Sequence, residues 1–214
     1  MTTTAAKQKS LTTKLAVTGM LTALAIVLQY IEFPVPMLVP PFLKMDFSDL
    51  PELIAAFVIG PVWGVAVCFL KNLIHIPFGS TGGVGELSNF LLGAVFALTA
   101  GLIYQRNKTK KTALLACGLG SLAMAVFSFP INYFIVYPVY SNLWFGGNMG
   151  LIVDMYKLIL PFSDSLEKCL VIFNVPFTLV KAIIVSVITM LIYKPLSRLV
   201  TRMDASFTKK KDKT

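Results

Sequence analysis

The sequence predicts an all-α membrane protein: a compact bundle of six transmembrane helices with both termini in the cytoplasm. Of the 214 residues, 56% are hydrophobic and only 14% are charged, whereas soluble domains usually carry about 25% charged residues. The mean hydropathy is +0.77. A soluble chain could not cover its surface with so few polar groups, and six spans of about 20 residues would use most of this length.

The apolar runs can be placed in order along the chain. The first span covers about residues 15–33 and leads into a proline-rich loop. A second helix is expected from Ser48, as N-cap with acids in the first turn, to Gly60 before Pro61. It is short for a full crossing. Four further spans are expected at about residues 62–78, 87–104, 112–137 and 170–193.

The net charge of +9 is concentrated in three basic clusters at the ends of spans. The positive-inside rule places all three clusters in the cytoplasm, which agrees with six crossings. Nothing like a folded basic domain accompanies the charge, so nucleic acid is not an expected partner. The clusters are Lys7, Lys9 and Lys14; Arg106, Lys108, Lys110 and Lys111; and seven cations from Lys194 to Lys213.

We therefore expect a multi-pass protein of a prokaryotic cell membrane in three parts. Residues 1–14 form a cytoplasmic tail that is retained rather than cleaved, residues 15–195 the membrane domain, and residues 196–214 a basic cytoplasmic tail. The three cysteines are far apart and there is one histidine, so no metal site is expected. The chain lacks the GxxxxGK[ST], HExxH and GxSxG motifs, which favours a binding protein over an enzyme.

The sixth span carries a polar stripe formed by Asn174, Thr178 and Lys181. Spacings of four and three residues put these side chains on one helix face. A lysine at bilayer depth costs at least about 2.5–3.5 kcal/mol. Near an interface, a lysine can extend its ammonium to water by snorkelling, but Lys181 lies far from both ends of the span. We interpret the stripe as one wall of an outward-facing pocket, with Lys181 at the floor donating to an acceptor.

Polar residues in the fifth span and its neighbours could complete such a pocket. Asn132 is expected in the pocket because its amide needs partners in an apolar setting. Tyr133 and Tyr137 fit a pocket or an interfacial belt equally well. Asn89 could line the same cavity or cap the fourth span, and both readings stay open.

The loop PPFLKMDFSDLP carries Lys44, Asp46 and Phe47. A rigid surface turn would explain the helix cap, but it would leave apolar side chains facing water. We therefore interpret this loop as a lid over the pocket. In the first span, Gly19 and Ala23 are four residues apart with Ala16 nearby, and small residues at this spacing let another helix approach closely.

Three stretches together resemble the riboflavin-specific substrate-binding (S) component of energy-coupling factor (ECF) vitamin transporters. They are FPVPMLVPPFLKMDFSDLPELIAAFVIGPVWGV (residues 33–65), KNLIHIPFGSTGGVGELSNFLLGAVF (71–96) and NVPFTLVKA (174–182). The resemblance implies one vitamin bound near the outer face, under the loop after the first helix. It also implies a separate ECF module of one transmembrane coupling protein and two ATPase subunits.

The resemblance also implies roles for single residues. Asn132 and Lys181 stand at the family's pocket asparagine and lysine. Thr178 replaces a residue that usually bears an amide, and Asn174 one turn earlier could substitute for it. Gly19 and Ala23 replace the AxxxA-type motif that contacts the coupling protein.

The expected function is therefore capture of riboflavin at the outer face with high affinity, with riboflavin as transported ligand and no cofactor. Riboflavin is flat, largely apolar and neutral, which suits a cavity of aromatic and aliphatic side chains with a few polar groups. The alternatives are an S component for biotin, folate or thiamine, a solitary facilitator, or a small lipid-modifying membrane enzyme. Biotin and folate would each offer a carboxylate to Lys181.

Overall fold

The computed structural model describes residues 2–35, 39–192, 195 and 198, with side chains described from residue 11 onward. The regular secondary structure of this part of the chain is helical except for one ladder of two-residue strands, so the predicted all-α class is confirmed. The helices are α1 (Thr2–Tyr30), α2 (Asp49–Val58), α3 (Pro61–His75), α4 (Val84–Arg106), α5 (Lys110–Ile131), α6 (Tyr137–Trp144), α7 (Met149–Lys157), α8 (Leu166–Cys169) and α9 (Val175–Leu191). A 3-10 turn, η1 (Ile76–Phe78), and two π-helical segments, η2 (Asn132–Val136) and η3 (Leu170–Asn174), join them. Strands β1 (Phe33–Pro34) and β2 (Lys44–Met45) pair antiparallel.

Five segments of the described chain are long and apolar enough to cross a membrane, one fewer than predicted. The difference is α2, which has only 10 residues and is about 15 Å long, half the hydrocarbon thickness of a bilayer. The five segments are Leu11–Tyr30, Pro61–Phe78, Val84–Arg106, Lys110–Trp144 and Leu166–Leu191.

The second crossing is made by a loop and α2 together. The C-terminal end of α2 lies at the same end of the bundle as the α4–α5 turn, because Phe57 stacks on Tyr104 with ring centroids 4.2 Å apart. The N-terminal end of α2 therefore lies near mid-depth, and the loop from α1 reaches down to it. Such non-helical backbone is tolerated at membrane depth when it is buried in protein. Met45, Asp46 and Ser48 are all buried.

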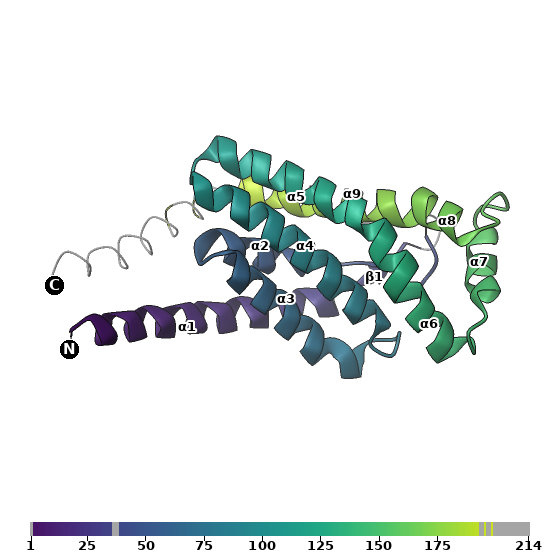
Figure 1. The fold of residues 1–214 in the computed structure, drawn as a ribbon, viewed down its shortest axis with the longest axis horizontal. Helices are drawn as coiled ribbons and strands as arrows, with labels where there is room; N and C mark the ends of the chain where they lie inside the picture. Colours follow the sequence, from purple (N-terminus) through teal and green to yellow (C-terminus); the bar gives the residue numbers. More distant parts are fainter. Residues whose placement is uncertain (1, 36–38, 193–194, 196–197, 199–214) are drawn as a thin grey trace.

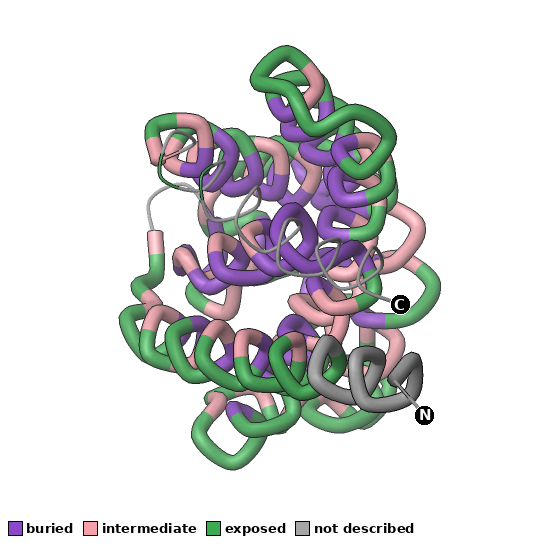
Figure 2. Tube along the Cα trace, turned by 90° about the vertical axis from the view of Figure 1, so that its left-hand side faces the viewer, coloured by how far each residue is buried: buried purple, intermediate pink, exposed green. Residues whose placement is uncertain are grey.

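Protein surrounds the short helix α2 on all sides. Eight of its ten residues are buried, and it packs against α1, α3, α4 and α9 (Figure 1). The view along the bundle shows the buried residues gathered at its centre and the exposed ones outside (Figure 2). Gly64 of α3 permits this packing, since a Cβ there would lie 2.8 Å from the Cβ of Ala56. Helix α2 is thus a core element, not a lipid-facing span.

Two prolines set the π-helical segments at the outer ends of the fifth and sixth spans. Pro138 and Pro176 have no N–H, and each ring would clash with the carbonyl four residues earlier in a regular helix. In both helices the residue before the proline donates its N–H five residues back, from Tyr137 to Asn132 and from Val175 to Leu170. The widened turns turn Asn132 and Asn174 inward, where both are buried. π-bulges are frequent at functional sites.

Several predicted boundaries need correction. Helix α1 begins at Thr2 and therefore includes residues 2–14 of the predicted cytoplasmic tail. The fifth span does not end at about residue 137 as predicted but continues through α6 to Trp144. The predicted outer loop contains α7, capped by the Asn148 side chain. Apart from Arg198, the predicted C-terminal tail of residues 196–214 lies outside the described residues.

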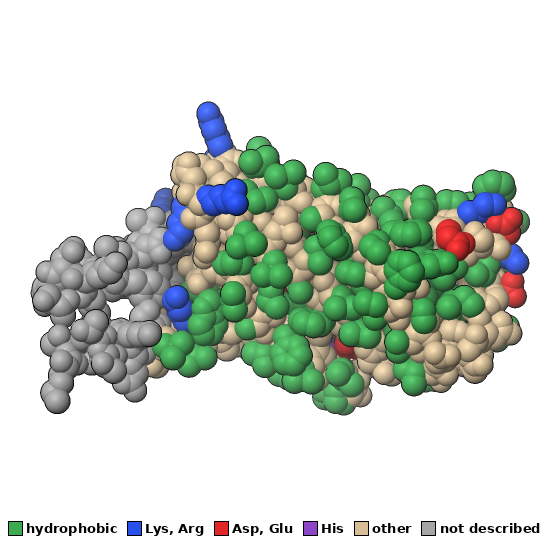
Figure 3. All heavy atoms as spheres, in the orientation of Figure 1, with side chains coloured by type: hydrophobic (Ala, Val, Ile, Leu, Met, Phe, Trp, Pro, Cys, Tyr) green, Lys and Arg blue, Asp and Glu red, His purple; other side chains and the backbone are tan. Residues whose placement is uncertain are grey.

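The surface matches a protein that spans a membrane with its basic end inside. In Figure 3 a broad belt of hydrophobic side chains covers the bundle, lysine and arginine gather at one end, and acids gather with lysines at the other. The basic end holds the exposed residues of the α4–α5 turn: Arg106, Lys108, Lys110 and Lys111. The N-terminal end of α1 and the C-terminal end of α9 lie on this side (Figure 1).

Candidate ligand-binding pocket

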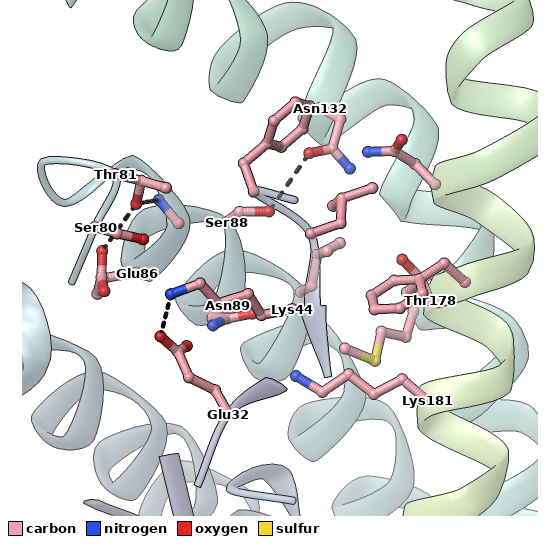
Figure 4. A pocket seen from close by; sticks show the side chains of 17 residues that line it. Glu32, Lys44, Ser80, Thr81, Glu86, Ser88, Asn89, Asn132, Thr178 and Lys181 are labelled. Atoms are coloured by element: carbon pink, nitrogen blue, oxygen red, sulfur yellow. Dashed lines mark hydrogen bonds and ion pairs between the residues drawn. The ribbon is translucent and has the colours of Figure 1, made fainter. Parts of the chain in front are cut away.

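A pocket opens between the β1–β2 loop, α4, α5 and α9, away from the basic end (Figure 4). Its lining atoms enclose about 700 Å³ of space, including the part open to solvent. Six of the ten predicted binding residues line it: Lys44, Asn89, Asn132, Asn174, Thr178 and Lys181. The other lining residues are Glu32, Phe42, Leu43, Ser80, Thr81, Gly85, Glu86, Ser88, Leu92, Met124 and Phe177.

Lys181 lies at the floor of the pocket and is paired within the protein. Its Nζ lies 2.8 Å from Asp46 Oδ2 and 3.3 Å from Asp49 Oδ2, and the residue is 4% exposed. It is about 15 Å from the end of α9 at Leu191, so it does not snorkel. An ammonium has three N–H donors. Asp46 accepts one of these N–H groups, and Asp49 forms an ion pair with the ammonium but no hydrogen bond, so N–H donors remain for an acceptor in the pocket.

Asp46 supplies the main partner of Lys181 and is itself held by the loop. Its Oδ1 accepts from the Ser48 backbone N–H at 2.8 Å and from the Ser48 hydroxyl at 2.5 Å. The ammonium of Lys181 and the two hydrogen bonds from Ser48 stabilise the charged form of Asp46, which in turn supports the charge on Lys181.

The predicted cap by Ser48 is wrong in one respect. Ser48 stands at the N-cap position of α2, but its side chain caps no backbone N–H of that helix. The hydroxyl instead donates to Asp46 and accepts from Lys71. The buried charges compete successfully for this hydroxyl because hydrogen bonds to charged groups are stronger than those to backbone amides.

The second cation of the pocket, Lys44, lies at the mouth and is also paired. Its Nζ lies 2.5 Å from Glu32 Oε1, and both side chains are partly exposed. The pair joins strand β2 to the end of α1, next to the β1–β2 ladder. In Figure 4 the two residues lie on the side of the pocket opposite Asn132.

Asn132 is fixed by α4 and by its own helix. Its Nδ2 donates to the Ser128 carbonyl at 2.8 Å and lies 3.1 Å from the Ser128 hydroxyl, while Oδ1 accepts from Ser88 at 3.4 Å. The Ser128 hydroxyl lies 3.2 Å from that of Thr178. Hydroxyls and an amide from three helices thus form one polar wall of the pocket.

Asn174 is held by a closed ring of hydrogen bonds with two tyrosines. Asn174 Nδ2 donates to the Tyr137 hydroxyl at 2.9 Å, and the Tyr156 hydroxyl donates to Asn174 Oδ1 at 2.7 Å. Since each phenol has a single proton, Tyr137 must donate to Tyr156, which it contacts directly. Tyr137 therefore lies behind the pocket wall and orients Asn174 without lining the pocket.

Three other predicted residues do not line the pocket. Asp46 lies beneath the floor, and Phe47 is partly buried outside the lining. Tyr133 donates to Glu167 at 2.9 Å on the outer surface, in the position of an interfacial tyrosine. Asn89 lines the pocket from α4 and does not cap that helix, whose N-cap position is Gly83.

Sequence reasoning missed part of the lining. Ser80 and Thr81 come from the glycine-rich loop before α4, which holds none of the predicted binding residues. Met124 could have been found, because it precedes Ser128 and Asn132 at successive intervals of four residues on one face of α5. Phe42 and Leu43 line this pocket and a smaller adjoining one, so this part of the loop lies between the two spaces.

Sequence reasoning also missed a cluster of charges below the pocket. Lys71 is fully buried, with its Nζ 3.0 Å from Asp49 Oδ1 and 2.5 Å from Glu52 Oε1. One turn further along α3, His75 Nδ1 lies 2.8 Å from Glu86 Oε1. Lys71 and His75 are one turn apart in the sequence, but their acidic partners come from other helices.

The stripe of small residues on α1 is open. Ala16, Gly19 and Ala23 are all exposed, and a Cβ built at Gly19 meets no atom within 4 Å. In the window that could span the membrane, α1 is 17% buried, against 39% for each of the other four spans. This face of α1 is available to another membrane helix.

The comparisons with known proteins agree with this architecture. Residues 13–193 match the family model described as the ECF transporter, substrate-specific component. The chain belongs to this family. Such a component is a transport protein, and this one is a multi-pass protein of a prokaryotic cell membrane, as predicted.

Similar proteins share most of the length of this substrate-specific component. It is 34% identical over 190 residues to "Riboflavin transporter RibU" of Staphylococcus aureus (strain TCH60), covering 89% of this chain and 93% of that relative. It is 35% identical over 184 residues to "Riboflavin transporter FmnP" of Bacillus subtilis (strain 168), covering 84% of this chain and 90% of that relative. A solved structure described as "Structure and mechanism of the S component of a bacterial ECF transporter" matches with a TM-score of 0.67 and 33% identity. The match covers 88% of this chain and 98% of the chain in that structure.

Proposed function

We propose that this chain is the riboflavin-binding component of an ECF importer, which takes the vitamin from the outer face and delivers it inward. The similarity to riboflavin transporters over at least 84% of the chain is the observation that carries the choice of ligand. It acts as a binding protein for cargo, without catalysis and without a cofactor of its own.

The chemistry of the pocket supports a neutral ligand. Among the described lining residues the cations are Lys44 and Lys181, and each lies against a carboxylate. A vitamin that carries a carboxylate, such as biotin or folate, would have to compete with Glu32 or Asp46 for these cations. Riboflavin is uncharged and only needs donors and acceptors for its carbonyls, ring nitrogens and hydroxyls. The charge pairing therefore favours riboflavin over carboxylates and over phosphorylated flavins.

The shape of the lining supports a flat apolar ring. Phe42, Leu92, Met124 and Phe177 supply apolar surface, whereas the N–H donors of Lys181 that Asp46 does not use offer hydrogen bonds at the floor. Pockets of this kind combine apolar walls with a few fixed polar groups. We propose that the ring enters between the apolar side chains. The loop residues Phe42 and Leu43, which divide the space, would then move aside and close over the ligand as a lid.

The binding test uses purified protein in detergent. A yellow preparation is expected where the vitamin co-purifies, and the protein stripped of ligand should quench flavin fluorescence at one riboflavin per chain. Thiamine and biotin should not compete, and riboflavin monophosphate should compete only weakly. A colourless protein that quenches no flavin fluorescence would refute riboflavin as the ligand. Displacement of riboflavin by biotin or thiamine would direct the assignment to those vitamins.

We further propose that the exposed face of α1 docks on the transmembrane coupling protein of a module that also contains two ATPase subunits. This chain lacks a phosphate-binding GxxxxGK[ST] motif, so ATP hydrolysis must occur elsewhere. Leucines at Gly19 and Ala23 should abolish uptake of riboflavin in cells that express the module. Binding of riboflavin by the purified variant should be unchanged, because these residues lie outside the pocket. Unchanged uptake would refute docking through this face.

A further inference from the structure

A chain of buried polar groups connects the pocket floor to a lysine that does not line the pocket. Five buried ionisable side chains from the loop, α2, α3 and α9 take part: Asp46, Asp49, Glu52, Lys71 and Lys181. Only Lys181 lines the pocket, and Lys71 is the most deeply buried of the two lysines, at 0% exposed.

Two routes join Lys71 to Lys181. Along the first, Lys71 contacts the Ser48 hydroxyl, which lies 2.5 Å from Asp46 Oδ1, and Asp46 Oδ2 lies 2.8 Å from Lys181 Nζ. Along the second, Asp49 places one oxygen 3.0 Å from Lys71 and the other 3.3 Å from Lys181.

The direction of the first route follows from the chemistry of its members. An ammonium can only donate, a carboxylate can only accept, and a hydroxyl has a single proton. Lys71 must therefore donate to Ser48, and Ser48 must donate its one proton to Asp46. Without Lys71 the Ser48 hydroxyl could rotate freely toward other acceptors, and Asp46 would lose an oriented donor.

Electrostatic attraction within the cluster also couples Lys71 to Lys181. Three carboxylates share two ammonium groups in this cluster. The carboxylates near Lys71 are attracted to its positive charge. If Lys71 were absent, Asp46 and Asp49 would have Lys181 as their only close cation in the cluster. Lys181 would then be drawn toward the two acids and away from the pocket.

We propose that Lys71 is a positioning residue for the ligand, acting from outside the pocket: through Ser48, Asp46 and Asp49 it fixes how far the Lys181 ammonium extends into the pocket. This inference rests on the proposed function for its ligand, riboflavin. It adds a residue on α3, a helix that the lining of the pocket does not include.

The test removes Lys71 together with its closest acid, so that the net charge of the buried cluster stays the same. The variant Glu52→Gln/Lys71→Met is compared with Glu52→Gln alone. Two quantities are measured in detergent: the Kd for riboflavin, and the 1H–13Cε resonance of Lys181 in ligand-free protein labelled with [13C]lysine. The resonance is assigned by its loss in Lys181→Arg. Lys157→Met is the matched control, since it removes a lysine from an exposed ion pair on α7.

We expect the double variant to bind riboflavin about tenfold more weakly than Glu52→Gln, which corresponds to about 1.4 kcal/mol. Its Lys181 resonance should move. Ser48→Ala, which keeps all five charges and cuts only the first route, should move the same resonance and weaken binding about threefold. Lys157→Met should change neither quantity.

Kd values within about twofold of the reference proteins would overturn the proposal. So would weaker binding with an unmoved Lys181 resonance, because Lys71 would then only hold the fold together. If the double variant does not fold, Ser48→Ala decides between these outcomes. If the unmodified protein binds no riboflavin, the proposed function fails. The Lys181 resonance still tests the coupling between Lys71 and Lys181, because it is measured in ligand-free protein.

Discussion

Replacing Lys181 with methionine should separate the two tasks of this lysine: stabilising buried acids and binding the ligand. Methionine keeps most of the volume and removes the charge. In the folded protein, Asp46 would lose its partner at 2.8 Å while remaining buried. Removing one member of a buried ion pair costs about 3–5 kcal/mol. We expect the lower end of this range, because Ser48 still donates to Asp46 and Lys71 still faces Asp49.

The same substitution should also weaken binding of riboflavin. A hydrogen bond from a charged group contributes about 1.5–3 kcal/mol, which corresponds to a rise in Kd of roughly 10- to 150-fold. Fluorescence titration measures this Kd, and thermal melting of the ligand-free protein in the same detergent measures the loss of stability.

The double variant Asp46→Asn/Lys181→Met tells the two effects apart. Because it removes both charges of the pair, it should recover most of the melting temperature lost in Lys181→Met. It should not recover affinity, since the donor to the ligand is still missing. A folded Lys181→Met protein with a Kd within about threefold of the unmodified protein would refute the assignment of Lys181 to the ligand. Recovery of affinity in the double variant would refute it equally.

Three further substitutions test other parts of the site. Asn132→Ala should raise the Kd for riboflavin by about tenfold or more, through loss of a buried amide on the pocket wall; an unchanged Kd would remove this residue from the site. Tyr156→Phe should raise the Kd about two- to tenfold because the 2.7 Å hydrogen bond that orients Asn174 is lost, and fluorescence titration with a ligand-free melt as control checks this. Gly64→Val should cost about 1–3 kcal/mol, since the new Cβ would lie 2.8 Å from the Cβ of a buried alanine in α2. Gly19→Val, with no atom within 4 Å, is its control for melting temperature, and equal melting temperatures would contradict the packing argument.

Local pattern was enough to predict most of the spans. Long apolar runs bounded by basic residues correctly indicated α1, α4, α5 and α9, because a membrane requires about 20 apolar residues for each helix. Helix α7 could also have been predicted, since Met149, Ile152, Val153 and Tyr156 follow a helical spacing. The half-length of α2 was suspected from its short apolar run, but the sequence could not show that a buried loop completes the crossing.

Whether a contact in the site could be predicted depends on how far apart its two residues are in the sequence. Spacing placed Asn174, Thr178 and Lys181 on one face, and all three line the pocket. The partner of Lys181, Asp46, is 135 residues away in sequence. Both residues were candidates for the site, but no periodicity connects a loop to a helix so remote. Lys71 was not among the predicted site residues for the same reason, because its acidic partners lie on another helix, α2.

The half-length of α2 also determines how cargo can leave. The pocket ends at Lys181, which contacts Asp49 in the first turn of this helix, and below it the described chain is filled by buried side chains, among them Leu53, Phe57 and Val58. The molecule is thus built as a cup with a solid base, not as a tube. A ligand that enters the cup has only the mouth to leave by, unless α2 is torn from the centre of the bundle. Delivery to the other side of the membrane must then change where the mouth points, with the interior left intact.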